Sequence, residues 1–317
     1  FIFQGPHMRE EFLNSPNPHE TDTIESLSDS MYHLGKVDIT ITSGQSVRLG
    51  KQVPFLISIL TRRTSQTYSV HWDWLLDAYH DLEWDNDVTE FREYYPGNTN
   101  DMSEGILGGW LLSMKSFVVW EFKLVELPDD MRQTMYGYCT KHYNSGVYKV
   151  STISKYVDPS KKTEFIYLAL NLPRIKCFQK FKRAVKRLTI AFPSLTPWIC
   201  WYLQAKRRAI AFKACKDVNE KILKKLSPTS NGQEGMGGYL KMSAAGMKHL
   251  IGDELLTHVA SFAQSFEDAL SLKEEGFATE YKRQTKAAKK KFAEEKHQYK
   301  APDGLKMMEE WESRCHK

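Results

Sequence analysis

Few side chains in this sequence have the types and the spacing that catalysis or metal binding needs. Asp73 and Asp77 are one helical turn apart and follow His71, so the three could exchange protons with a substrate. Carboxylates four residues apart on a helix are, however, usually solvated charges. Cys139 and His142 have the spacing of zinc ligands, but no second pair accompanies them. We therefore expect a protein that is not an enzyme, with no catalytic residue, no metal site and no cofactor.

The common catalytic motifs are also missing from the sequence. It contains no nucleophile elbow, Rossmann glycine pattern or His-Glu-x-x-His. A Gly-rich stretch at 227–238 lacks the Gly-Lys-Ser/Thr ending of a phosphate-binding loop, so we interpret it as a linker.

Positive charge is concentrated in one segment. From Arg174 to Lys225 there are 15 Lys or Arg residues and only two acids, which gives this segment a charge of +13. The whole chain carries +5, so the rest of it must carry −8. A solvated basic face would be the ordinary explanation, but this asymmetry favours a surface that binds a polyanion.

Two expected helices would position these charges. In the first helix, expected over 178–187, the basic residues lie on one side. The opposite side is expected to form a buried stripe of Phe178, Phe181, Val185 and the following Leu188. A second helix is expected over 198–226, after Pro193 and Pro197. Aromatic residues lie among the charges, where bases could stack on them: Phe178, Phe181, Phe192, Trp198, Trp201, Tyr202 and Phe212. These features indicate a binder of nucleic acid or of another anionic surface.

Three motifs resemble the nucleoprotein of orthobunyaviruses. Gly44-Gln-Ser-Val-Arg-Leu49 leads into an apolar run at 53–60, a helix in that family, with Arg62 and Arg63 after it. Tyr95-Pro-Gly-Asn98-x-Asn100 is similar to the family's Phe-Pro-Gly-Asn-Arg-Asn turn, although Thr99 replaces the arginine that contacts RNA. The stretch from 213 to 252, with Gly237-Gly238, is similar to the closing pattern of the family. The matches cover about a sixth of the chain, whose greater length suits emaraviruses or another divergent bunyavirus.

The resemblance implies a fold and a function. The fold would be mainly α, with two lobes, a small N-terminal β element and flexible terminal arms. The protein would coat single-stranded genomic RNA in a groove between the lobes, largely independently of sequence, in the virion and the host cytoplasm. Its partners would be RNA, further copies of the chain docked through the arms and the viral polymerase, but no membrane. By position, Arg62 and Arg63 correspond to lysines of that groove. The other candidate RNA-binding residues do not come from the resemblance: charge adds Lys180, Lys182, Arg183, Lys186, Arg187, Lys206, Arg207, Arg208 and Lys213, and Arg48 and Lys51 complete the set.

The two lobes and terminal arms that the resemblance implies, together with composition and turn signals, predict the domain limits. The apolar fraction of 41% indicates a globular protein, and five scattered cysteines favour a reducing compartment over a disulfide framework. Residues 1–8 look like a cloning remnant and are left out of the expected fold.

We expect an N-terminal arm over 9–36, an N-lobe over 37–158, a C-lobe over 159–252 and a C-terminal arm over 253–317. Within them, we expect a strand over 37–42 that turns at Ser43-Gly44, a helix after Pro54, a helix or a pair of strands over 106–120 and a helix over 253–270.

A protein that binds anionic membranes, or a scaffold protein, is the competing class, because the same basic helices would suit lipid headgroups. Co-purified RNA, seen as a high ratio of absorbance at 260 nm to that at 280 nm, would separate the two classes.

Overall fold

The computed structural model describes residues 1–14, 27–31, 37–46, 48–80, 82, 88–95, 97–100, 103–128, 131, 136–216, 231–243 and 252–275. The chain divides into two compact units: residues 1–139 with 218–281, and residues 140–217 with 282–317. The expected boundary at 158 falls inside the second unit. The reason is that Tyr143 packs against the rings of Trp198 and Tyr202, which ties residues 140–150 to the helices that follow.

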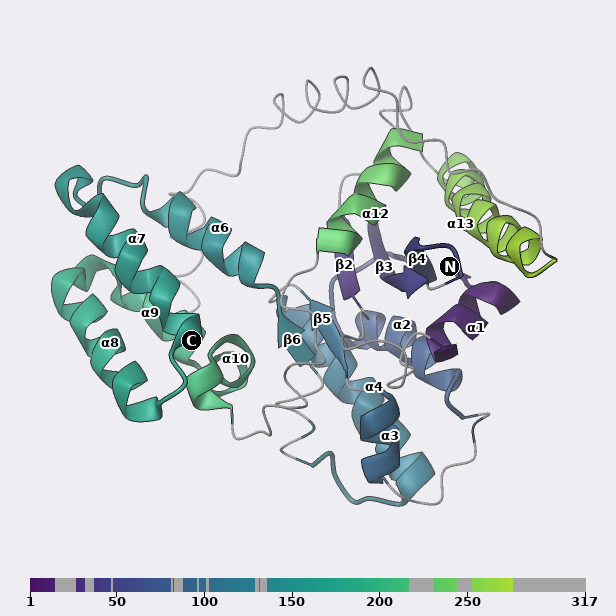
Figure 1. The fold of residues 1–317 in the computed structure, drawn as a ribbon, viewed down its shortest axis with the longest axis horizontal. Coiled ribbons are helices and arrows are strands. Elements are labelled where there is room, and N and C mark those ends of the chain that lie inside the picture. The colour runs from purple at the N-terminus through teal and green to yellow at the C-terminus, as the bar shows by residue number, and fades with distance from the viewer. Residues whose placement is uncertain are drawn as a thin grey trace. The chain divides into compact units, whose positions relative to one another are not determined.

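A six-stranded sheet organises the first unit (Figure 1). Its order is β1 (Ile2–Phe3), β4 (Lys51–Leu60), β3 (Asp38–Ser46), β2 (Leu27–Met31), β5 (Asn98–Asn100) and β6 (Tyr136–Tyr138). The first four are antiparallel neighbours, whereas β5 pairs in parallel with both β2 and β6. The expected class, mainly helical with an N-terminal β element, is confirmed.

The strand expected from residue 37 is confirmed, but the helix expected after Pro54 is wrong. Strand β4 covers this stretch and pairs with β3 from Asp38–Leu60 to Ser46–Lys51. The hairpin turns beyond Ser46, not at Ser43-Gly44. Pro54 lies opposite Ser43, where the register shifts, and a bulge tolerates a residue without an N–H group. Ile57 and Ile59 are β-branched, and residues 53–60 are buried without interruption, which suits a strand covered on both faces.

Residues 1–8, expected to lie outside the fold, are part of it. Ile2 and Phe3 pair with Ser58 and Ile57 of β4, and helix α1 (Pro6–Asn14) buries Met8 completely. Phe12 packs its ring against those of Phe55 and Tyr79 in the same unit.

The described parts of the expected N-terminal arm also belong to the first unit. Residues 9–14 lie in α1, and residues 27–31 form β2 between β3 and β5. Docking of residues 9–14 on another copy is therefore excluded while α1 stays packed. The remainder of the expected arm lies outside the described residues.

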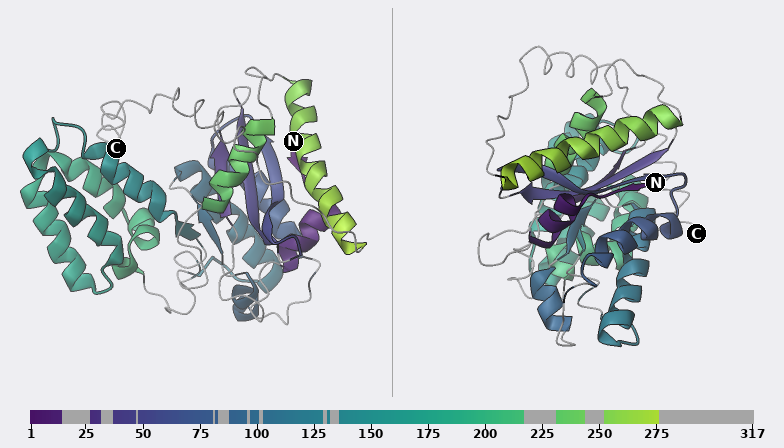
Figure 2. Two further views of the ribbon diagram at one scale, coloured as in Figure 1. Left: turned by 45° about the horizontal axis from the view of Figure 1, so that its top comes forward. Right: turned by 90° about the vertical axis from the view of Figure 1, so that its right-hand side faces the viewer.

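Alternation along β3 and β4 gives the sheet two different faces. Ile39, Ile41, Ile57 and Ile59 are buried against α12 (Asn231–Ser243) and α13 (Asp253–Glu274). Figure 2 shows these two helices together on that face. The expected linker at 227–238 is thus partly helix α12. The helix expected over 253–270 is confirmed as α13, but it packs on the sheet instead of forming an arm. Residues 276–317 lie outside the described residues.

The opposite face carries α2 (Ser65–Asp77), which packs on α4 (Glu104–Phe122). The side chains from β3 and β4 on this face include Thr42 and Ser58, which contact His71 of α2. Close approach of the two helices needs small residues, because a Cβ atom on Gly109 would lie 2.5 Å from Cβ of Tyr68. Helix α3 (Val88–Tyr94) adds Phe91, whose ring contacts those of Phe117 and Phe122 of α4.

Every regular element in the described part of the second unit, 140–216, is a helix. In order, it contains α6 (Thr140–Val150), η1 (Pro159–Lys161), α7 (Lys162–Asn171), η2 (Leu172–Arg174), α8 (Phe178–Ala191), η3 (Pro193–Leu195), α9 (Thr196–Leu203), α10 (Ala205–Ala211) and η4 (Lys213–Cys215). The helix expected over 198–226 is wrong in its length. Gln204 has ψ 140° and breaks it into α9 and α10.

Candidate nucleic-acid interface

Helix α8 presents a continuous basic face. Phe181 and Leu188 are buried at 3% and 0% exposure. The remaining circumference carries five exposed cations, Lys180, Lys182, Arg183, Lys186 and Arg187, which we call the basic face. At 3.6 residues per turn, these five span about 160° of the helix. The expected buried stripe is only partly right, because Phe178 is 42% exposed and Lys182 Nζ lies 4.8 Å from its ring centroid.

Little negative charge balances the basic face. Residues 140–216 contain 17 Lys or Arg and two acids, Asp158 and Glu164. Glu164 lies 4.0 Å from Arg187, with both side chains largely exposed, and such a pair contributes little. Asp158 instead accepts hydrogen bonds from the backbone and side chain of Ser160. The described part of the unit therefore carries a large uncompensated positive charge.

Helix α10 and the turn after it supply fewer cations than expected. Arg207 is 4% exposed, donates to the carbonyl of Trp201 at 3.2 Å and lies 4.0 Å above the Trp201 ring centroid. It also donates to Gln204. Arg207 is therefore a structural residue, and its expected contact with RNA is contradicted by its burial. Arg208 and Lys213 are exposed, whereas the side chain of Lys206 is outside the described residues.

Lys216, which was not among the candidates, has a strongly perturbed ammonium group. Burial lowers its pKa to about 8, and the charge of Lys213 adds to this effect. A cation that is partly desolvated beside a second cation gains more than an exposed one from a bound anion. The sequence gives only a weak signal for this site, the spacing of two lysines three residues apart.

An exposed thiol with a lowered pKa lies at the start of α8. Cys177 is exposed and precedes the first helical residue. The backbone N–H groups of Lys180 and Gln179 lower the pKa of this thiol, with smaller contributions from the charges of Lys180 and Arg183. Cys177 is a natural reporter of what approaches the basic face.

Two of the candidates from the first unit contact acids of that unit. Arg48 forms ion pairs with Glu10 at 3.1 Å and with Glu11. Arg63 lies 3.2 Å from Asp38.

Lys51 and Arg62 are the other two candidates of the first unit. Lys51 Nζ lies 5.2 Å from the ring centroid of Phe266, and burial lowers its pKa. Arg62 is exposed. All four candidates belong to the first unit, whereas α8 belongs to the second. Arg48 and Arg63 already contact acids of the first unit.

The aromatic residues expected to stack on bases are mostly core residues. Exposure is at most 6% for Phe181, Phe192, Trp198, Trp201, Tyr202 and Phe212. Their rings contact one another, as in the pairs Trp198–Tyr202 and Phe181–Phe212. Only Phe178 of that set is exposed. The interleaving of aromatic and basic residues therefore reflects amphipathic helices, not a stacking surface.

The residues considered for catalysis and zinc binding do not lie together in an arrangement that suits either role. His71 is fully buried between Ser58 and Thr42, and Asp77 pairs with Arg9 at 3.3 Å. Among the described residues, Cys139 and His142 belong to no group of three possible metal ligands.

Comparison of the chain with protein-family models and with curated protein sequences found no match. No helix in the described residues is long and apolar enough to span a bilayer.

Proposed function

We propose that this chain is a nucleoprotein that binds single-stranded RNA through the basic face of α8, with Arg208, Lys213 and Lys216 as further contacts. The observation that carries the proposal is the uncompensated positive charge of residues 140–216, with two acids against 17 cations. Phosphate binding releases counterions and requires no particular base. Burial of the aromatic residues supports contacts to the backbone of the RNA and leaves little surface for reading bases.

The single-stranded form of the RNA, and its identity as a viral genome, rest on the motif resemblance. The same holds for further copies of the chain and the viral polymerase as partners. Coating would require neighbouring copies to contact one another, and the described residues of both expected arms are packed within the first unit. We therefore expect any contact between copies to use surfaces other than these described arm residues.

A charge-reversal pair tests the proposal. Arg183→Glu with Lys186→Glu removes two cations from the exposed side of α8 without touching its buried residues. Lys115→Glu with Lys273→Glu, at exposed positions of the first unit, is the matched control because it changes the net charge equally. Fluorescence anisotropy with a labelled 20-nucleotide RNA should show at least about a tenfold loss of affinity for the first variant only. Equal losses in both variants would refute a localised interface.

Binding to an anionic membrane surface is the second candidate function. It is favoured by Ile190, which is 70% exposed on α8 close to the basic face, and by the half-exposed Phe178. Sedimentation with vesicles of phosphatidylserine and phosphatidylcholine, in competition with RNA, separates the two. Retention on vesicles in the presence of excess RNA would favour the membrane.

A further inference from the structure

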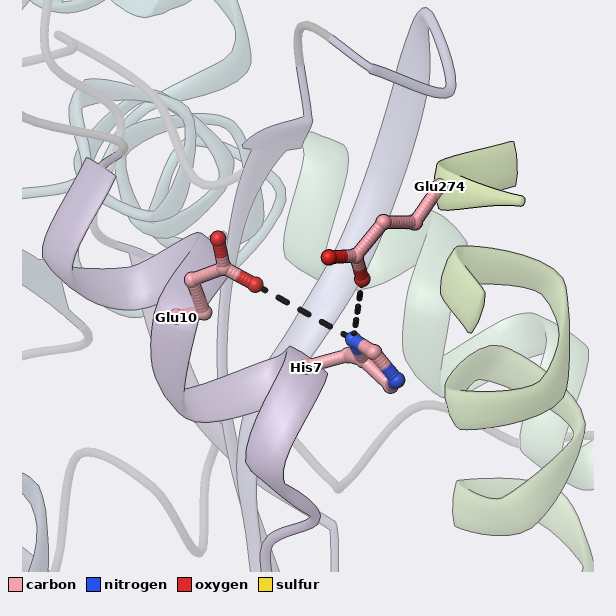
Figure 3. Close-up of side chains that lie close together, drawn as sticks. All are labelled: His7, Glu10 and Glu274. Carbon is pink, nitrogen blue, oxygen red and sulfur yellow. Dashed lines mark ion pairs between the residues drawn. The ribbon is translucent and has the colours of Figure 1, made fainter. Parts of the chain in front are cut away.

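Three side chains of types that can bind a metal ion converge where the first helix meets the end of the last described helix. His7 and Glu10 lie on successive turns of α1, and Glu274 is the last residue of α13 (Figure 3). His7 Nδ1 lies 3.1 Å from Glu274 Oε2 and 3.9 Å from Glu10 Oε2. All three ligand atoms lie within 4.8 Å of one another.

These separations suit a tetrahedral ion. Ligands about 2.0 Å from a zinc ion at tetrahedral angles are about 3.3 Å apart. Two of the three separations, 3.1 and 3.9 Å, lie on either side of that value, and the third is at most 4.8 Å, so rotamer changes would bring the three ligand atoms to the geometry. An imidazole nitrogen and two carboxylate oxygens are all atoms that zinc accepts as ligands, and three of them would leave the fourth position to water.

The carboxylates around His7 would also favour a bound cation. Glu10, Glu11 and Glu274 all lie within 4.0 Å of one guanidinium, that of Arg48, so carboxylates outnumber the guanidinium groups in these contacts. Glu274 also lies at the C-terminal end of α13, where the helix dipole disfavours an anion. A divalent ion would neutralise the excess, and Arg48 would stay hydrogen-bonded to Glu10 and orient its carboxylate.

The backbone that carries His7 is already fixed. The Glu267 carboxylate of α13 accepts hydrogen bonds from the N–H groups of His7 at 2.6 Å and Met8 at 3.0 Å. Met8 itself is fully buried. Binding an ion would therefore order only the outer parts of three side chains, which keeps the entropic cost small.

We infer that His7, Glu10 and Glu274 form a binding site for a divalent transition-metal ion, Zn²⁺ in the first instance. The ion connects α1 to the end of α13, two segments more than 250 residues apart in the sequence. Because it binds the folded unit and not the unfolded chain, it stabilises that unit. This inference does not depend on the proposed binding of RNA.

Isothermal titration of the nuclease-treated full chain with ZnCl₂, together with thermal unfolding, tests the site. Zinc at 100 times its dissociation constant should raise the unfolding midpoint by about 5 °C. His7→Gln and Glu274→Gln should each weaken zinc binding at least about tenfold and remove most of that rise. Glu275→Gln, next to the site and also exposed, should behave as the unchanged chain.

Zinc bound only by the cysteines of the chain would give the same titration in all four proteins and would refute the site. An unchanged midpoint in the unsubstituted chain would refute it as well. If His7→Gln fails to give a folded protein by circular dichroism, Glu274→Gln decides the outcome alone.

Discussion

The hydroxyl oxygen of Ser58 lies 2.7 Å from Nδ1 of His71, in the buried layer between β4 and α2. Nε2 of the same ring lies 2.8 Å from Oγ1 of Thr42 on β3. A neutral imidazole can donate through one nitrogen and accept through the other, so this ring satisfies both hydroxyls. The contact joins the sheet to α2, on which α4 packs.

This contact predicts loss of stability in mild acid. Burial lowers the pKa of His71 to about 3, so below its ordinary pKa of 6.5 the unfolded state takes up a proton that the folded state does not. The free energy of unfolding should fall by about 1.4 kcal/mol per pH unit from this group as the pH drops from 6.5 towards 3, and the group has no effect above 6.5. Urea unfolding at pH 7, 6 and 5 measures it. In His71→Gln, the free energy of unfolding should change less with pH, while His258→Gln should behave as the unsubstituted chain does. If His71→Gln and the unsubstituted chain had the same slope of this free energy against pH, the burial of a neutral ring would be contradicted.

Alanine substitutions at Gly109 and Gly235 should change the free energy of unfolding in opposite directions, because only Gly109 lies in the close contact between α2 and α4. A Cβ atom at Gly109 would lie 2.8 Å from the backbone nitrogen of Ser69, which cannot move without shifting α2. Gly109→Ala should therefore destabilise the chain by about 1–3 kcal/mol. Gly235, in α12, has no atom within 4 Å of such a Cβ, so Gly235→Ala should stabilise by about 0.5–1 kcal/mol. Thermal unfolding of both variants is the check, and a harmless alanine at 109 would rule out the described helix contact.

The lowered pKa of Lys216 predicts that RNA binding weakens in mild alkali. With a pKa of about 8, the ammonium is mostly protonated at pH 7 and mostly neutral at pH 9, whereas a bound phosphate would favour the proton. Affinity should fall by up to about tenfold between these pH values. Arginine stays protonated, so Lys216→Arg should abolish the fall, and Lys186→Arg should retain it. Anisotropy titrations at pH 7, 8 and 9 measure the effect. A fall that survives in Lys216→Arg would remove Lys216 from the interface.

Bound RNA should shield the Cys177 thiol. Its lowered pKa gives more thiolate than an ordinary exposed cysteine has, so iodoacetamide should modify it faster than Cys200. RNA over the basic face should slow this reaction, both by blocking access and by its negative charge, and 1 M NaCl should restore it. Peptide mass spectrometry quantifies each cysteine. An unchanged rate at Cys177 with saturating RNA would place the RNA elsewhere.

Local patterns predicted several of the elements. The alternation from residue 37 gave a strand, and the helical spacing around Phe181 and Leu188 gave α8 with its exposed cations. The apolar spacing after Asp253 gave α13. In these cases the local pattern and the tertiary environment favour the same structure, so the sequence is sufficient.

Other features depend on contacts between distant residues. Strand β4 was missed because both of its faces are covered, so the apolar run around Leu56 has no simple alternation. Arg207 was expected to be exposed, and only the position of Trp201 shows that it is buried. His7 and Glu274 meet through packing of α1 on α13, which no short pattern encodes.

The salt dependence of RNA affinity tests the central claim most directly. Dissociation constants for 20-nucleotide homopolymers and a mixed RNA should be measured from 50 to 300 mM NaCl. If phosphate contacts dominate, the logarithm of the association constant should fall linearly with the logarithm of the salt concentration, with a slope of about −0.7 per contact. The association constants of the different RNAs should differ by less than about tenfold. Five or more contacts, as the basic face would allow, give a slope of about −3.5 or steeper. A flat salt response, or a large preference for one short motif, would contradict the account.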